Sequence, residues 1–462
     1  MTQLRATLHD VADQIADYRE SLSTSRVTPL ASRSVVRESL TMPLPDAGAT
    51  LPEVVAELAK QATPGLMASA GPRYFGFVIG GSTDAALAAD LLTSGWDQVG
   101  FNEAVSPAAI AFEDVAGAWL KDLLRIPQSA SVGFVTGAQA ANNVGLAAAR
   151  WKVLSDQGWD VGVDGLFGAP RIRVVAGEER HATVDRALRL LGFGERSLEI
   201  VPAAANGAME THSLAAALAR HPGTPTIVVA QAGNVNTGAF DDLTNISALA
   251  KEHGAWLHVD GAFGLWAAAS PEHTHLVDGL EEADSWGCDG HKWLNVPYDS
   301  GYAFCAHPDL HATAMAYTAE YLTGQVAGRE FGGGDFVPES SRRARGFATW
   351  AALRSLGRSG VADLIDRGCR LARYLAEGVS AIDGVEIPND VVLNQVLISV
   401  GDTDLTNEVE RMIQDDGRVW MGATTWRGRR LLRAAISNWS TTEDDIDVAV
   451  KAISAAIARA RS

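Results

Sequence analysis

Short apolar runs separated by helical stretches dominate the middle of the chain, between residues 131 and 306. Each run is continuously apolar rather than alternating, which is typical of central strands that are covered by helices on both faces. The pattern therefore predicts an α/β architecture. The expected strands lie at residues 132–135, 172–176, 198–201, 226–230, 256–260, 285–288 and 301–306.

The flanking regions have other patterns. The N-terminal part reads as amphipathic helices joined by a proline-containing segment, with too few apolar positions for a core of its own. The C-terminal part alternates short strands with helices and closes on a helix at residues 443–460. We expect three parts: an N-terminal helical arm at residues 1–70, a large domain at 71–358 and a small C-terminal α+β domain at 359–462.

A glycine-rich stretch with poor periodicity lies between Met315 and Arg345. Long segments of this kind are often functional loops, so we expect a mobile loop here. The stretch that follows, residues 346–378, has helical periodicity.

Composition and charge narrow the function classes. The chain has 462 residues with a net charge of -18, the wrong sign for general attraction to nucleic acid or to anionic membranes. No stretch of about 18 apolar residues predicts a transmembrane helix, and no signal peptide is visible. The three cysteines, Cys288, Cys305 and Cys369, are far apart and odd in number, which argues against a disulfide framework. We expect a cytoplasmic protein without a metal site, because no cluster of His, Asp or Glu has ligand spacing.

The candidate chemistry gathers where the strands end. Asp260 closes the strand 256–260, and Lys292 follows the strand 285–288 in the sequence DGHKW. Open α/β sheets bind ligands at the carboxyl ends of their strands, so both side chains are expected in one crevice. A lysine amine can form a Schiff base with an aldehyde, and a carboxylate can keep a pyridine nitrogen protonated. Together they indicate pyridoxal 5'-phosphate.

Two further features suit the same cofactor. TGAQAANN, residues 136–143, is a turn of small residues between a strand and a helix, and helix N-termini bind phosphate. His181 is a flat side chain that could cover the cofactor ring. Each residue alone has a plainer interpretation: Lys292 as a surface lysine, Asp260 as a helix cap, and His181 as a structural histidine.

The chain resembles the group II pyridoxal-phosphate-dependent amino acid decarboxylases, which include aromatic amino acid and glutamate decarboxylases. The most specific motifs are HVDGA and HKWLN. Corroborating motifs are PRYFGFVIGG at residue 72, TGAQAAN, HATVDRALRLLG, QAGNVNTGAFDDL at 231, SRRARGFATWAALRSLG at 341 and TTWRGRRLLRAAISNW at 424. The resemblance implies a fold-type I, aminotransferase-like architecture with a mostly parallel central sheet, and a homodimer with its active site at the interface.

The resemblance also implies roles for individual residues. Lys292 would be the Schiff-base lysine and Asp260 the partner of the pyridine nitrogen. Ala262 would pack on one face of the ring and His181 on the other, where it could help with protonation. The phosphate would be bound by Ala138 and Gln139 through backbone N–H groups, with His291 nearby.

Several positions depart from the family pattern. Many relatives have asparagine where this chain has Asp289, whose charge would repel a phosphate unless it points away or accepts a hydrogen bond. Decarboxylases of the family place a tyrosine on the mobile loop to protonate the alpha carbon. Here Tyr317 and Tyr321 lie near the start of that loop, and Phe336 lies around the expected position of the tyrosine.

The residues that would contact substrate are less distinctive. Ser106 and Pro107, with Phe77, Phe101 and Trp96, resemble the family's side-chain pocket and favour an aromatic or bulky amino acid, although such aromatic residues also occur in cores. Two arginines could bind a substrate carboxylate or form structural ion pairs: Arg345 and Arg433.

These observations predict decarboxylation of an L-amino acid to the amine and carbon dioxide. Another reaction of the same cofactor stays open: aldehyde-forming oxidative deamination, transamination, or a lyase step at a C–C or C–S bond. A non-catalytic binding protein is a further alternative, against which Lys292 and Asp260 argue. A dinucleotide-dependent dehydrogenase is disfavoured, since no GxGxxG sequence opens a helix after a strand.

Overall fold

The computed structural model describes residues 2–315 and 331–462. The chain forms two compact units. One unit comprises the chain up to Ile79 together with Arg373–Pro388 and Val396–Ser462, and the other comprises Gly80–Ala372 and Asn389–Gln395. The division into three parts expected from the sequence stays a prediction.

A seven-stranded sheet forms the centre of the second unit, in the order β1-β7-β6-β5-β4-β2-β3. Five adjacent strands, β6, β5, β4, β2 and β3, run parallel to one another, whereas β7 runs antiparallel to β6 and β1. The strands are β1 (Ser131–Val135), β2 (Arg173–Gly177), β3 (Leu198–Val201), β4 (Thr226–Gln231), β5 (Trp256–Asp260), β6 (Ser285–Asp289) and β7 (Gly301–Cys305).

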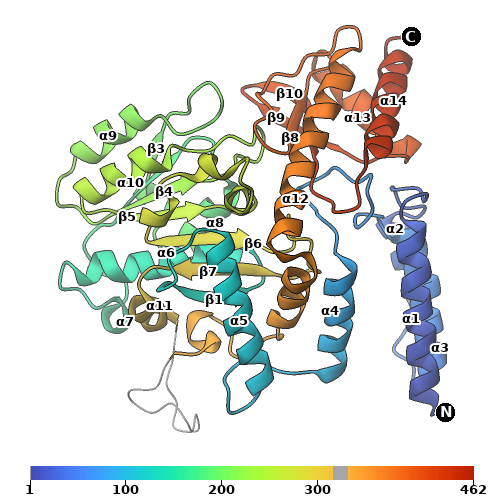
Figure 1. Ribbon diagram of the computed structural model, residues 1–462, viewed down its shortest axis with the longest axis horizontal. Helices are drawn as coiled ribbons and strands as arrows, with labels where there is room; N and C mark the ends of the chain where they lie inside the picture. The colour runs from blue at the N-terminus through green and yellow to red at the C-terminus, as the bar shows by residue number, and fades with distance from the viewer. Residues whose placement is uncertain (1, 316–330) are drawn as a thin grey trace. The chain divides into compact units, whose positions relative to one another are not determined.

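Helices cover both faces of this sheet, which explains why its central strands are apolar along their whole length. Helix α6 packs on α8 and α11, and α9 packs on α10 (Figure 1). Every residue of β5, β6 and β7 is buried. The helices are α4 (Asp84–Trp96), α5 (Pro107–Leu123), α6 (Ala138–Ser155), α7 (Val161–Asp164), α8 (Ala182–Leu190), α9 (Thr211–Ala219), α10 (Leu243–Glu252) and α11 (Pro308–Met315).

Helix α12 (Gly346–Ser380) is kinked at Gly357. This residue has a φ of +62°, a left-handed conformation that glycine adopts without steric cost. The glycine therefore lets the chain continue as a second helical segment in a new direction.

The other unit holds the N-terminal helices and a three-stranded sheet in the order β8-β10-β9, in which β9 and β10 are antiparallel. A capping box at Thr442 opens its last helix. The elements are α1 (Gln3–Ser21), α2 (Arg33–Leu40), α3 (Leu51–Ala62), β8 (Gln395–Ile398), α13 (Thr403–Asp416), β9 (Gly422–Trp426), β10 (Arg429–Ala435) and α14 (Glu443–Ala460).

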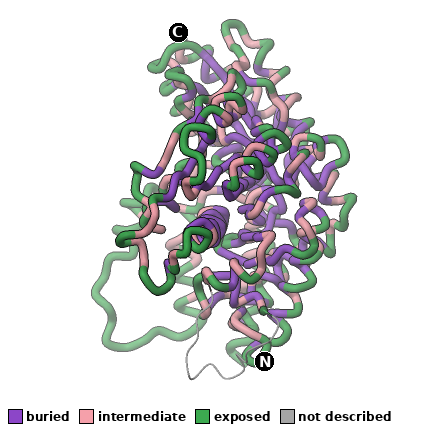
Figure 2. The backbone as a smooth tube through the Cα atoms, turned by 90° about the vertical axis from the view of Figure 1, so that its left-hand side faces the viewer, coloured by how far each residue is buried: buried purple, intermediate pink, exposed green. Residues whose placement is uncertain are grey.

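Buried positions are concentrated in the interior, and the outer helices and loops carry the exposed ones (Figure 2). The three cysteines are all buried and form no disulfide. Burial raises the pKa of the Cys305 thiol to about 12. Among the described residues, no helix is long and apolar enough to cross a membrane.

The α/β architecture and the seven expected strands are confirmed. The glycine-rich stretch differs in part from the expected loop, because Gly333, Asp335, Phe336 and Val337 are buried. A 3-10 turn at Gly333–Phe336 packs beside β1 and α11 there, so this end of the stretch belongs to the core.

Candidate active site

Asp260 ends β5, and its residue is only 4% exposed. Its Oδ2 accepts a hydrogen bond from the Asn142 side-chain amide at 3.0 Å. Its Oδ1 accepts one from the backbone N–H of Ala262 at 3.3 Å, so the carboxylate also caps the turn that follows the strand. Ala262 is thereby fixed two residues after Asp260, at the carboxyl edge of the sheet.

A buried chain of polar side chains lies behind Asp260. The Asn142 carbonyl oxygen lies 3.0 Å from His258 Nε2, and His258 Nδ1 lies 2.9 Å from Ser285 Oγ. Trp256 donates its ring N–H to the same Ser285 hydroxyl. An amide oxygen can only accept, so His258 carries its proton on Nε2 and Ser285 donates to Nδ1. Burial lowers the pKa of His258 to about 4, which keeps the ring neutral.

Lys292 follows β6 in a tight turn, with its side chain 20% exposed. Its Nζ lies 3.0 Å from Asp289 Oδ2 and 6.0 Å from the centre of the Phe263 ring. A side chain at Gly80 would collide with the Lys292 carbonyl, so only glycine lets the chain pass this close to the lysine backbone. The lysine is held between an apolar ring and a carboxylate, at the end of the strand next to β5.

The N-terminus of α6 lies at the same edge. Its first residue, Ala138, donates its backbone N–H to Asp289 Oδ1 at 2.5 Å. Gln139 directs its side-chain amide at the Thr183 carbonyl, 3.2 Å away, and its own Oε1 is buried without a partner. A Cβ added to Gly137 would lie 3.0 Å from Asp289 Oδ1, so this turn leaves room only for a glycine.

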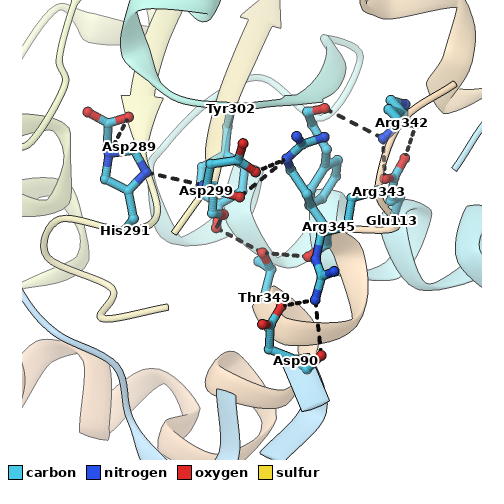
Figure 3. A network of polar contacts seen from close by, with 12 residues as sticks. Asp90, Glu113, Asp289, His291, Asp299, Tyr302, Arg342, Arg343, Arg345 and Thr349 are labelled. Atoms are coloured by element: carbon cyan, nitrogen blue, oxygen red, sulfur yellow. Dashed lines mark hydrogen bonds and ion pairs between the residues drawn. The ribbon is translucent and has the colours of Figure 1, made fainter. Parts of the chain in front are cut away.

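His291 lies beside this N-terminus, stacked on Tyr298 with ring centres 4.3 Å apart. Its Nδ1 accepts the backbone N–H of Ser300 at 3.2 Å, and its Nε2 lies 3.4 Å from Asp289 Oδ1 (Figure 3). Burial is the main cause that lowers the pKa of His291. The sequence left open whether Asp289 points away or accepts a hydrogen bond; it points inward and accepts.

His181 caps the N-terminus of α8, where its Nδ1 accepts the backbone N–H of Thr183 at 3.3 Å. The Thr183 hydroxyl lies 2.8 Å from the same nitrogen. Asn142 also donates to this hydroxyl, at 3.4 Å, while bonding Asp260. His181 is thus connected to Asp260 through two intervening side chains, and its Nδ1 is engaged as the cap of α8.

The remaining candidates are more dispersed. Arg345 forms an ion pair with Asp299 at 2.7 Å, which is the structural alternative considered for it (Figure 3). Phe336 is 8% exposed and packs on His311, so it is a core residue. Tyr317 and Tyr321 lie outside the described residues.

The residues compared with a substrate pocket lie between the end of α4 and the start of α5, or in the first unit. Ser106 donates to Gln98 at 3.1 Å, and Trp96 packs edge-on against Phe347. Phe77, in the first unit, stacks on Trp420. Burial lowers the pKa of Arg433, also in the first unit.

These side chains fit pyridoxal phosphate at its aldehyde and at its ring, and in part at its phosphate. The Lys292 amine matches the aldehyde, and the buried Asp260 carboxylate, held by the Asn142 amide, matches the ring nitrogen. The His181 imidazole matches the ring face. The Gly137 turn and the Ala138 N–H match a phosphate in shape and polarity. Only Asp289 departs from this match, because it brings a negative charge to the phosphate end.

Asn142 and His258 were not predicted as site residues, although Asn142 lies in the motif TGAQAANN and His258 in HVDGA. Asn142 lies four residues after Ala138 and therefore on the same face of α6. That spacing was the sequence signal that could have placed Asn142 beside the predicted cofactor site. The partnership with Asp260 joins residues 118 positions apart and needed the fold.

Comparison with known proteins gives a consistent result. Residues 35–400 match the family described as "Pyridoxal-dependent decarboxylase conserved domain". The chain is 28% identical to tryptophan decarboxylase 1 of Oryza sativa subsp. japonica, over 94% of this chain and 90% of the relative. It is 26% identical to phenylacetaldehyde synthase of Arabidopsis thaliana, over 98% and 95%. The crystal structure of Oryza sativa TDC with PLP and tryptamine superposes with a TM-score of 0.91 at 26% identity, covering 99% of this chain and 98% of that one.

Proposed function

Because the chain belongs to the pyridoxal-dependent decarboxylase family, we propose that it converts an aromatic L-amino acid to the amine and carbon dioxide with pyridoxal phosphate as cofactor. One observation carries the proposal for this chain. Asp260 and Lys292 lie at the carboxyl ends of neighbouring parallel strands, where Asp260 pairs in register with Gly287. A lysine and a buried carboxylate at adjacent strand ends are the two groups that this cofactor needs.

The cofactor supplies an aldehyde that bonds to amines and a ring that accepts the electron pair left when carbon dioxide departs. Lys292 would hold the aldehyde covalently and give way to the substrate amine. Asp260 would keep a proton on the ring nitrogen. Asn142 fixes the Asp260 carboxylate, and the neutral His258 behind it adds no charge that would compete for the carboxylate.

Other residues of the chain would bind and orient. Ala138, Gln139 and His291 would face the phosphate, and Ala262 and His181 would pack on the two ring faces. Since His181 Nδ1 accepts the backbone N–H of Thr183, the proton of the neutral ring is on Nε2. His181 could donate that proton to the alpha carbon, which takes up one proton for each carbon dioxide released.

An aromatic substrate is supported by the tryptophan decarboxylase relative and by the aromatic residues near the start of α5. Trp96 is 52% exposed, so its face is available to another ring. Aromatic pairs contribute about 0.5–1.5 kcal/mol beyond area burial, enough to favour an aromatic over an aliphatic substrate by about two- to tenfold.

Aldehyde formation is the second candidate, because a relative covering nearly the whole chain is named phenylacetaldehyde synthase. The two reactions differ in their products: the amine with carbon dioxide, against the aldehyde with ammonia and carbon dioxide. The second route is a two-electron oxidation that also consumes dissolved dioxygen and leaves hydrogen peroxide. Phe336 does not decide between them, since it is buried against His311 and not exposed to a substrate.

The N-terminal arm, residues 2–70, supports a homodimer. Its helices and the segments between them expose a series of large apolar residues that a protein in water usually covers. The cytoplasm stays the predicted location, and the three buried thiols without a disulfide suit it. The exposed apolar residues of this arm include Leu4, Leu8, Leu30, Val35, Leu40, Met42, Leu44, Leu51, Val54 and Leu58.

A product assay tests the proposed reaction. Purified protein with added pyridoxal phosphate would be given tryptophan, tyrosine, phenylalanine, glutamate and leucine, while carbon dioxide, amine, ammonia and aldehyde are followed together. Amine and carbon dioxide in equal amounts from an aromatic substrate is the expected result. Ammonia and aldehyde would replace decarboxylation by the second candidate, and no product from any amino acid would contradict both.

A further inference from the structure

The Asp289 carboxylate is the centre of a set of hydrogen-bond donors. Its Oδ1 accepts the Ala138 N–H at 2.5 Å, and its Oδ2 lies 3.0 Å from Lys292 Nζ. His291 Nε2 is 3.4 Å from Oδ1. Because Ser300 donates to His291 Nδ1, the ring proton of neutral His291 is on Nε2 and faces the carboxylate.

Two of these donors, the Ala138 N–H and the His291 N–H, are the kind that bind a phosphate monoester. A helix N-terminal N–H and an imidazole N–H give directional hydrogen bonds at the positive end of the helix dipole, whereas Lys292 would bond to the aldehyde. The Asp289 side chain is 4% exposed, so it interacts with these groups in a poorly screened environment. The chain therefore supplies its own anion at the place where the phosphate of the cofactor would bind.

We propose that the Asp289 carboxylate competes with the cofactor phosphate for the Ala138 N–H. The carboxylate must leave this N–H before the phosphate can occupy it. This inference rests on the proposed cofactor site. The Ala138 N–H has one hydrogen and cannot serve both anions fully. A carboxylate kept beside the phosphate would also repel it. Asp289 thus weakens the preference of the site for a phosphorylated aldehyde over the same aldehyde without phosphate.

The experiment compares two aldehydes that differ only in the phosphate. Dissociation constants of pyridoxal and pyridoxal phosphate would be measured by calorimetry on protein freed of cofactor with hydroxylamine, for the natural chain and for Asp289→Asn. Effects of the substitution on Lys292 act on both aldehydes, so the ratio of the two constants isolates the phosphate. The ratio is the dissociation constant of pyridoxal divided by that of pyridoxal phosphate, so a higher ratio means a stronger preference for the phosphorylated aldehyde. We expect this ratio to rise at least about tenfold in Asp289→Asn, the size of one lost charge contact.

Asp284→Asn is the matched control. Asp289 ends β6, and Asp284 precedes the first residue of the same strand, where it pairs with His307. The substitution therefore removes an equal charge at the end of β6 that is away from the site. Its ratio should equal that of the natural chain. Asp289→Ala is a second variant expected to change in the same direction, and thermal unfolding checks that each variant is folded.

An unchanged or lower ratio in both folded Asp289 variants would overturn the inference. Absence of binding of either aldehyde to any variant would overturn it together with the cofactor site. Binding with a raised ratio but without carbon dioxide release would support the inference and remove only the proposed reaction, so the two failures are distinguishable.

Discussion

The side-chain amide of Asn142 donates a hydrogen bond to Asp260 Oδ2 at 3.0 Å, between two buried side chains. The same amide group accepts from His258 through its oxygen. Asn142 therefore orients the carboxylate from one side and is itself oriented from the other. Neither aspartate nor leucine at position 142 could do both.

Asn142 variants should separate these two roles. Asn142→Leu leaves the buried His258 N–H without an acceptor, so the free energy of unfolding should fall by about 1–3 kcal/mol. Asn142→Asp keeps that acceptor but repels Asp260, so it should lower turnover more than stability. Chemical denaturation and steady-state kinetics measure the two effects, with Asn143→Ala on the same helix as control. Equal turnover in all three variants would remove Asn142 from the site.

Lys292→Ala should abolish covalent retention of the cofactor. After borohydride reduction the natural chain should gain the mass of one pyridoxal phosphate less one oxygen atom, because imine formation releases water and reduction then adds two hydrogens and fixes the bond. The variant should gain none. Lys251→Ala, near the end of α10, is the control and should behave as the natural chain. A cofactor adduct in Lys292→Ala would assign the bond to another lysine.

Asp260→Asn should lower turnover by about 10²–10³-fold, the range for loss of one preorganised electrostatic group. The amide cannot hold a proton on the ring nitrogen, so the ring accepts electrons poorly. The dissociation constant of the cofactor should change much less than turnover. Asp278→Asn, in an exposed pair with Arg125, gives the comparison. Near-normal turnover in Asp260→Asn would contradict its role.

Arg342 and Glu113 form a buried ion pair, each side chain 2% exposed, with Nη2 and Oε2 2.6 Å apart (Figure 3). Arg342→Met should lower the free energy of unfolding by about 3–5 kcal/mol, because Glu113 is left buried without its partner. The exposed pair of Arg358 and Asp122 provides the control. Arg358→Met should cost less than about 1 kcal/mol in urea denaturation. Equal losses in the two variants would show that burial does not determine the contribution of these pairs.

Because His258 is neutral in the folded chain, the free energy of unfolding should decrease in acid. Its folded-state pKa of about 4 lies below the usual 6.5, so the unfolded chain takes up the proton first as the pH falls. Stability from this residue is therefore complete well above pH 6.5 and declines towards pH 4. Between pH 7.5 and 5 the loss should be about 2 kcal/mol.

His258→Gln should lack this part of the pH dependence. Urea denaturation of both proteins at several pH values gives the difference, in which the many other acidic groups cancel. A difference that does not change between pH 7.5 and 5 would mean that His258 titrates alike in the folded and unfolded chain.

Local pattern was sufficient to predict much of the fold. The strand 256–260 and the helix 443–460 were predicted with the observed bounds, because a short apolar run marks the strand and amphipathic spacing marks the helix. The chemistry of Asp260 and Lys292 followed from their position after two such strands. The fold of the family is confirmed by the superposition with the rice structure.

Other features depend on contacts between distant segments. Nothing local shows that β7 runs antiparallel between β6 and β1. The direction of the Asp289 side chain was likewise open, since it depends on Ala138, 151 positions earlier. Phe336 lies in a glycine-rich stretch that resembles a loop, and its burial arises from packing on His311.

Because Cys288, Cys305 and Cys369 are buried, we expect the native protein to be unreactive towards thiol reagents. Alkylation should begin only when the chain opens, so the rate of labelling reports unfolding residue by residue. A single cysteine introduced on an exposed helix would then be the one reactive thiol of the native chain. Fluorophores or spin labels could be attached there without first removing the natural cysteines.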